Sequence, residues 1–228
     1  MPLSVTLYLY VMMLQMYKIF TTFEIGMTEI CDTYRSVAAR GEGIYKELGS
    51  RFLAFAFPVE TEDEVKEFVD ALRVKYHDAR HHCYAYRLGQ DGSRFRANDD
   101  GEPSSSAGRP ILGQIDSAGL SDTLVVVVRY FGGIKLGIPG LVRAYRTAAA
   151  EAIASSGTVE KVSSRAYRLC FDYLQMNQVM RVLKDMSIPQ SRQIFEQLCS
   201  IDVKVRLGSD EIFRERVSNI SSCILREL

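Results

Sequence analysis

Four glycines stand close together in the middle of the sequence, at Gly132, Gly133, Gly137 and Gly140. They separate an apolar run from an alanine-rich stretch. Glycine lets backbone N–H groups approach an anion, and the start of a following helix carries partial positive charge. The segment therefore has the general form of a phosphate cradle, although no Gly-Lys-Ser/Thr gives it the spacing of a P-loop. A tight turn with close packing is the alternative explanation.

Basic and aromatic side chains are interleaved around these glycines, and no acidic residue lies between positions 129 and 146. Arginine and lysine can pair with phosphates, and aromatic rings can stack on bases. A surface that binds nucleic acid or phosphate is one interpretation, and a strand end followed by a solvated helix face is the other. The residues assigned to this surface, besides Gly132, Gly133 and Gly137, are Arg129, Tyr130, Phe131, Lys135, Arg143 and Arg146.

A polar loop at residues 98–110 carries the carboxylates of Asp99, Asp100 and Glu102. Their oxygens suit a hard cation, but they lack the spacing of a calcium loop, so we assign no metal and no cofactor. A solvated turn, or a partner for Arg109, is the other explanation.

The sequence contains one pair of adjacent histidines, His81 and His82. Neighbouring side chains on a strand point to opposite faces, so the two cannot form a ligand pair. His81 could still face the binding surface alone. The residues predicted to support that surface are His81, Asp99, Asp100, Glu102 and Arg109. No catalytic residue is assigned.

Hydrophobic patterns predict the elements that position these residues. Thr61 and Glu64 form a capping box in front of a helix that extends to Tyr76. Short apolar runs with turn residues between them indicate strands. The predicted strands are residues 52–57, 84–88, 94–97 and 124–130, and two further helices are predicted at residues 111–118 and 141–155.

The C-terminal part begins after a predicted linker at residues 157–164. Its pattern is strand, helix, strand, strand, helix, with Ser209 as the cap of a last helix that reaches Ile224. This order matches a ferredoxin-like α+β fold with its helices on one face of the sheet, and the pattern predicts that the last strand of that fold is lacking. We therefore predict two domains, residues 27–160 and residues 161–228.

Residues 1–26 form an N-terminal extension that is apolar over most of its length. Three interpretations stay open: translation that in fact starts at Met27, a structured or oligomerising arm, and a membrane segment. Polar residues interrupt the apolar run, so we predict no membrane partner. The chain from Met27 onward is expected to fold without the extension.

Charge and cysteine content bound the class of protein. The formal net charge is +0 over 228 residues, which does not imply overall steering towards nucleic acid. Residues 161–228 are mildly basic, with 11 Lys and Arg against 8 Asp and Glu. The five cysteines are scattered and form no CxxC pair, as is typical of reduced thiols in a cytoplasmic protein.

Several segments together form a more specific pattern than any one of them. They are Ala79–Arg87, Asp99–Ser104, Ala107–Ile111, Val125–Gly137 and Gly140–Tyr145. This pattern resembles the IMPACT family, in its bacterial YigZ-like branch, over about residues 33–228. Two departures are Ser105-Ser106, where Gly-Thr is common, and Ile138-Pro139, where a small residue and glycine are usual. Pro139 removes one backbone donor from the loop.

The resemblance implies a larger domain like the second domain of ribosomal protein S5. It implies a smaller domain like the C-terminal domain of the translocating elongation factor. Both relatives touch RNA on the ribosome, and eukaryotic members regulate translation initiation. No catalytic mechanism comes with the resemblance.

Two functions follow as hypotheses. The first is a nucleic-acid or ribosome-associated binding protein with a role in the regulation of translation. Its partners would be RNA, the ribosome or a translation factor, with no DNA sequence specificity inferred. The second is an enzyme that acts on a phosphorylated small molecule or nucleotide, with magnesium held by Asp99, Asp100 and Glu102. Fold alone does not separate them.

Overall fold

The computed structural model describes residues 32–228, which divide into two compact units, Thr33–Ser164 and Arg165–Leu228. The N-terminal extension at residues 1–26 and the proposed start at Met27 lie outside the described residues.

The larger unit is built on a five-stranded antiparallel sheet with the order β2-β3-β6-β4-β5. Its strands are β2 (Gly41–Glu47), β3 (Ser50–Pro58), β4 (His81–Leu88), β5 (Arg94–Asn98) and β6 (Thr123–Tyr130). The valine-rich β6 lies in the middle of this sheet, as expected for a run of apolar residues with no alternation.

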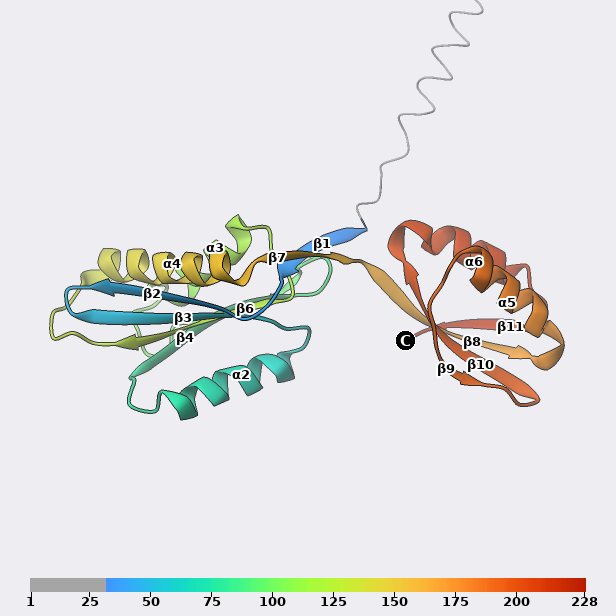
Figure 1. The fold of residues 1–228 in the computed structure, drawn as a ribbon, viewed down its shortest axis with the longest axis horizontal. Helices are drawn as coiled ribbons and strands as arrows, with labels where there is room; N and C mark the ends of the chain where they lie inside the picture. The colour runs from blue at the N-terminus through green and yellow to red at the C-terminus, as the bar shows by residue number, and fades with distance from the viewer. Residues whose placement is uncertain (1–31) are drawn as a thin grey trace, which may run out of the picture. The chain divides into compact units, whose positions relative to one another are not determined.

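Helices cover both faces of the sheet (Figure 1). One face packs against α3 (Gly108–Ser117) and α4 (Gly137–Ser156), and the other packs against α2 (Glu62–Lys75). The capping box predicted for α2 is confirmed: Glu64 N–H donates to Thr61 Oγ1 at 3.2 Å, and the Glu64 carboxylate accepts from Thr61 N–H.

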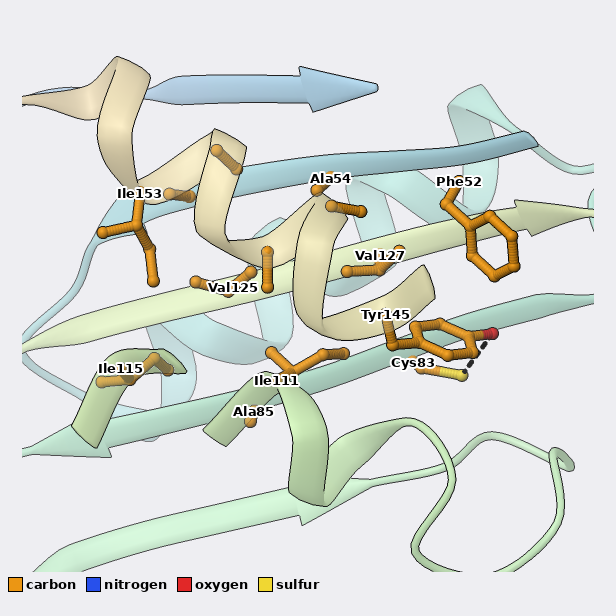
Figure 2. Packing of buried hydrophobic residues seen from close by; sticks show 14 of the residues in the cluster. Phe52, Ala54, Cys83, Ala85, Ile111, Ile115, Val125, Val127, Tyr145 and Ile153 are labelled. Atoms are coloured by element: carbon orange, nitrogen blue, oxygen red, sulfur yellow. Dashed lines mark hydrogen bonds between the residues drawn. The ribbon is translucent and has the colours of Figure 1, made fainter. Parts of the chain in front are cut away.

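The core between the sheet and α4 depends on small residues. A Cβ atom at Gly43 would lie 2.6 Å from the backbone nitrogen of Ala152, so β2 approaches the helix backbone directly. Alanines on α4 make this approach feasible, and the aromatic ring of Tyr145 fills the space near Phe52 and Cys83 (Figure 2). Tight packing here fixes the height of α4 above the sheet.

The segment expected as a linker, residues 157–164, contains a strand instead. β7 (Thr158–Val162) pairs antiparallel with β1 (Thr33–Val37), and both belong to the larger unit. Pairing with β1 supplies backbone hydrogen bonds that the sequence of β7 alone does not reveal.

The smaller unit confirms the ferredoxin-like prediction, with the order strand-helix-strand-strand-helix-strand. Its four-stranded sheet has the order β11-β8-β10-β9, and α5 and α6 pack on one face. The elements are β8 (Ser164–Asp172), α5 (Met176–Asp185), β9 (Gln190–Ile194), β10 (Leu198–Arg206), α6 (Asp210–Ser218) and β11 (Cys223–Glu227).

The prediction for the last helix is wrong in two respects. Ser209 makes no side-chain cap, and the helix ends at Ser218. A turn with Ser222 in the left-handed region (φ 54) then leads into β11, where Ile224 pairs with Cys170 and is 53% exposed. The prediction that the last strand is lacking is therefore wrong. β11 is present, because the turn at Ser222 ends the helical spacing of apolar residues that the prediction extended to Ile224.

An ion pair on β8 and β10 predicts how acid affects the smaller unit. Both carboxylate oxygens of Asp202 accept from Arg168, at 2.6 and 2.8 Å, and this bond lowers the pKa of Asp202 below its ordinary 3.8. The pair therefore adds stability above pH 3.8, which is lost as the pH falls through the folded-state pKa. We expect Asp202→Asn to flatten the acid limb of the pH–stability curve and to lower stability at neutral pH. Identical acid limbs in both proteins would contradict this.

Across residues 32–228, no helix is both long enough and apolar enough to cross a membrane.

Candidate nucleic-acid interface

A hollow of about 450 Å³ opens in the larger unit beside the glycine segment. It lies where the start of β4, the loop after β5, the end of β6 and the first turn of α4 meet. We call it the Lys135 hollow. The side chains that matter most in it are Arg80, His81, Glu102, Arg129, Phe131, Lys135, Ile138 and Leu141.

The floor of the Lys135 hollow is a buried ion pair. Arg129 Nη1 donates to Glu102 Oε1 at 2.6 Å, and the two side chains are 8% and 4% exposed. The Tyr145 hydroxyl donates to the same carboxylate oxygen at 2.8 Å. The guanidinium also lies 5.5 Å from the ring of Phe52 and 5.7 Å from the ring of Phe131. Charge, hydrogen bonds and aromatic faces thus compensate the desolvation of both groups.

Cys83 extends this network into the core. Its thiol lies 3.3 Å from the Tyr145 hydroxyl and 3.0 Å from the carbonyl oxygen of Asp99 (Figure 2 shows the bond to Tyr145). Burial raises the pKa values of the Cys83 thiol and the Tyr145 phenol. Both groups stay protonated, so this cysteine lacks the thiolate that nucleophilic catalysis requires.

Arg129 therefore differs from the sequence prediction. Its charge is neutralised by Glu102, and it forms a structural floor instead of an exposed phosphate contact. Its Nε has no partner among the described side chains and backbone groups, so one buried donor remains at the base of the Lys135 hollow. This ion pair holds the polar loop at residues 98–110 against the end of β6.

The walls of the Lys135 hollow carry exposed cations and apolar side chains. Arg80 and Lys135 are solvent-exposed, and neither forms an ion pair within residues 32–228. Phe131 is 51% exposed, and the nearby Ile138 is 57% exposed. A flat ring beside free cations can hold a planar group and an anion together.

The polar loop is held mainly by its own carboxylates. Asp99 accepts backbone N–H bonds from Ser105 (2.8 Å), Ala107 (3.0 Å) and Gly108 (2.8 Å), so it satisfies the start of α3. Asp100 accepts from His82 N–H at 2.7 Å and pairs with Arg73 at 3.1 Å. Asp99 is thus a structural cap, an ordinary use of a carboxylate at a helix start.

Asp99, Asp100 and Glu102 do not converge on one point, because each serves different partners. Within residues 32–228, no group of three His, Cys, Asp or Glu side chains is arranged to hold a metal ion. His81 lines the Lys135 hollow, with its Nδ1 2.8 Å from the carbonyl oxygen of Asp100. The neighbouring His82, also on β4, is buried, and burial lowers its pKa.

The glycines divide between the two explanations left open by the sequence. A Cβ atom at Gly132 would lie 1.9 Å from the carbonyl carbon of Gly49, so Gly132 is required by packing. Gly133 (φ 88) and Gly137 (φ 68) have backbone conformations that favour glycine, and they form the turn into α4. Leu136 at the start of that helix provides no side-chain cap. The uncapped first turn borders the Lys135 hollow, where partial positive charge favours an anion.

Three predicted surface residues lie elsewhere. Tyr130 points to the opposite face of the sheet, since side chains alternate along β6, and its hydroxyl donates to Asp78 at 2.7 Å. That bond raises the pKa of Tyr130. Arg143 pairs with Glu47 near the β2–β3 turn. Arg146 faces a second hollow together with Arg109.

Five residues that line the Lys135 hollow were not predicted as site residues: Arg80, Pro103, Leu136, Ile138 and Leu141. Arg80 and Ile138 add the most exposed charge and apolar surface among them. Arg80 directly precedes His81, at the entrance to β4, and this adjacency was the available signal. Ile138 was noted only as a departure from the family pattern, yet it supplies exposed apolar surface.

The known proteins that this chain resembles belong to one family. The family profile of the Impact N-terminal domain matches residues 48–153, which include the whole Lys135 hollow. The chain is 38% identical to the IMPACT family member YvyE of Bacillus subtilis over 153 residues, 67% of this chain and 70% of the relative. It is 37% identical to the IMPACT family member YigZ of Escherichia coli over 136 residues, 59% of this chain and 67% of the relative.

A solved structure is similar to this chain over most of its length. It is described as a crystal structure of a hypothetical protein, is 28% identical and superposes with a TM-score of 0.68. The match covers 87% of this chain and 98% of the other. The predicted resemblance and the predicted fold class are both confirmed.

Proposed function

The chain belongs to the IMPACT family, and from this premise we propose that it binds single-stranded RNA and acts in the regulation of translation. The RNA would be free or part of the ribosome, and the protein would work in the cytoplasm. Family resemblance supports the translational context, because the domain types it implies also occur in proteins that touch ribosomal RNA.

One observation carries the RNA part of the proposal. In the Lys135 hollow, an exposed aromatic ring, Phe131, lies beside Arg80 and Lys135, two exposed cations that form no ion pair with another residue of the described range 32–228. Single-stranded nucleic acid is bound by this combination, since bases stack on rings while cations neutralise the backbone. A base must be unstacked to reach Phe131, which favours a single strand over a duplex.

The alternative, a magnesium-dependent enzyme on a phosphorylated small molecule or nucleotide, has no comparable support. Its proposed ligands are bound to other groups: Asp99 to the start of α3, Asp100 to Arg73 and Glu102 to Arg129. No specific observation favours that reaction, so we propose only the binding function. A translation factor remains the protein partner to test after RNA.

Salt dependence of binding to a 12-nucleotide oligouridine tests the proposal. Each phosphate contact contributes roughly −0.7 to the slope of the log binding constant against the log salt concentration. Contacts from Arg80 and Lys135 therefore predict a slope of about −1.4 or steeper. Lys135→Ala should reduce the slope by roughly 0.7. Phe131→Ala should cost about 1–3 kcal/mol of binding with little change in slope, since it removes stacking.

Lys66→Ala is the matched control, because Lys66 is exposed on α2, which packs on the opposite face of the sheet. Its slope should equal that of the wild type. Each variant must first give a native melting curve. Binding without salt dependence, or an equal loss for Lys66→Ala and Lys135→Ala, would refute the proposed site.

A further inference from the structure

A second hollow, of about 500 Å³, lies between α3 and α4 in the larger unit. It is lined by Ser105, Arg109, Gln114, Val142 and Arg146, among others. We call it the Arg109 hollow. Among the described residues, no acidic side chain and no aromatic ring lines it, so its character is cationic and polar.

Both arginines of this hollow are available for a ligand. Arg109 and Arg146 are exposed, and neither forms an ion pair within the part of the chain that the structure describes. The neighbouring Arg143 is different, since Glu47 neutralises it. Two free guanidinium groups from two helices, facing one concavity, form a site that suits a phosphate group.

The rim of the Arg109 hollow is held in an uncommon conformation. Ser105 is a non-glycine residue with φ 63, and its backbone N–H donates to Asp99 Oδ2 at 2.8 Å. The bond to Asp99 compensates for the cost of this backbone conformation. It fixes an exposed hydroxyl-bearing residue at the edge of the concavity, next to the arginines.

The two hollows are neighbours that share their structural elements. Leu141 of α4 lines the Lys135 hollow, and the next residue, Val142, lines the Arg109 hollow. The same holds in the polar loop, where Pro103 borders the first and Ser105 borders the second. The ridge between them is therefore formed by this loop and the first turns of α4.

We propose that the Arg109 hollow is a phosphate-binding subsite, which holds the backbone of the same RNA strand whose base lies against Phe131. This inference rests on the proposed function. The absence of rings among its lining residues fits a phosphodiester and does not fit a base. A strand long enough to cross the ridge would engage both hollows, whereas a dinucleotide would occupy only the Lys135 hollow.

The test compares two probes, a 12-nucleotide oligouridine and a uridine dinucleotide. For the longer probe, Arg109→Gln and Arg146→Gln should each reduce the salt slope by roughly 0.7, and the double variant by roughly 1.4. At 0.1 M salt each loss corresponds to about fivefold weaker binding, the factor one contact contributes between 1 M and 0.1 M salt. The dinucleotide should bind all three variants as it binds the wild type.

Arg143→Gln is the matched control, because Arg143 lies on the same helix and outside both hollows. Its slope should match that of the wild type. If the double variant keeps the wild-type slope while Lys135→Ala loses part of it, the subsite is refuted and the proposed function stands.

If the wild-type protein binds no RNA, the proposed function fails, and so does the backbone assignment. Titration with inorganic pyrophosphate, followed by NMR of the α3 and α4 amides, then identifies any other phosphate ligand. Shifts that vanish in the Arg109→Gln/Arg146→Gln variant would show a site for free phosphates in place of an RNA subsite. No shifts would overturn the hollow as a phosphate site of either kind.

Discussion

Glu102→Gln is expected to cost about 3–5 kcal/mol in the unfolding free energy of the larger unit, because it leaves a buried charge without its partner. Arg129 lies over Phe52 with 8% of its side chain exposed, and Glu102 supplies its only ion pair within residues 32–228. The amide of glutamine keeps the shape of the side chain but not its charge. The guanidinium would then stay buried without an opposite charge, and the rings of Phe52 and Phe131 compensate only part of its desolvation.

Chemical denaturation followed by circular dichroism measures this loss, and hydrogen exchange of β6 and α4 amides assigns it to the larger unit. Glu67→Gln is the matched control, because Glu67 is exposed on α2. It should change stability by less than about 0.5 kcal/mol. A double variant, Glu102→Leu/Arg129→Met, should recover much of the loss, since replacing both charges removes the uncompensated one. Equal stability of Glu102→Gln and Glu67→Gln would show that the pair is not buried in solution.

Local sequence patterns predicted the elements well, because their causes are local. The valine run of β6 indicates a strand covered on both faces, and Thr61 with Glu64 specifies the start of α2. Ile224 shows where such reasoning ends. Its spacing continues the helical period of α6, but a turn at Ser222 moves it into β11.

The candidate site was harder to predict, because its decisive contacts join distant parts of the chain. Arg129 and Glu102 are separated by 27 residues, and Arg143 and Glu47 by 96. Spacing in the sequence identified a basic cluster, but not which of its charges are neutralised. Ion pairs neutralise Arg129 and Arg143, whereas Lys135, Arg109 and Arg146 form no ion pair with any residue from 32 to 228.

The alternation of strand side chains also divided the predicted surface. Tyr130 and its neighbour Arg129 were assigned to one face, yet Tyr130 contacts Asp78 on the other. The sequence placed both residues at the end of a strand, where the phase of alternation was open. Packing of α2 on one face and α4 on the other fixes that phase.

Gly132→Ala is the second variant with a large expected effect, a loss of about 3 kcal/mol at the upper end of the usual cost of overpacking. The added Cβ would lie 1.9 Å from the Gly49 carbonyl carbon and 2.2 Å from the Ser50 nitrogen. Both are backbone atoms, so no side-chain rotation relieves the overlap. The β2–β3 turn must move away from the end of β6, and the bond from Gly132 N–H to Ser50 Oγ, now 3.1 Å, would break.

Two other glycines separate this steric effect from effects of the backbone. Gly113 is helical, and a Cβ there meets nothing within 4 Å, so Gly113→Ala should stabilise α3 by up to about 1 kcal/mol. Gly133 is equally open but has φ 88, so Gly133→Ala should cost about 1–2 kcal/mol from strain alone. Thermal melts should therefore rank the four proteins, from most to least stable, as Gly113→Ala, the wild type, Gly133→Ala and Gly132→Ala.

Hydrogen exchange locates the loss in Gly132→Ala. Exchange should become faster first at the Arg51–Tyr130 end of the β3–β6 ladder, next to the displaced turn. A Gly132→Ala protein as stable as Gly133→Ala would show that the turn and the strand end are not in contact.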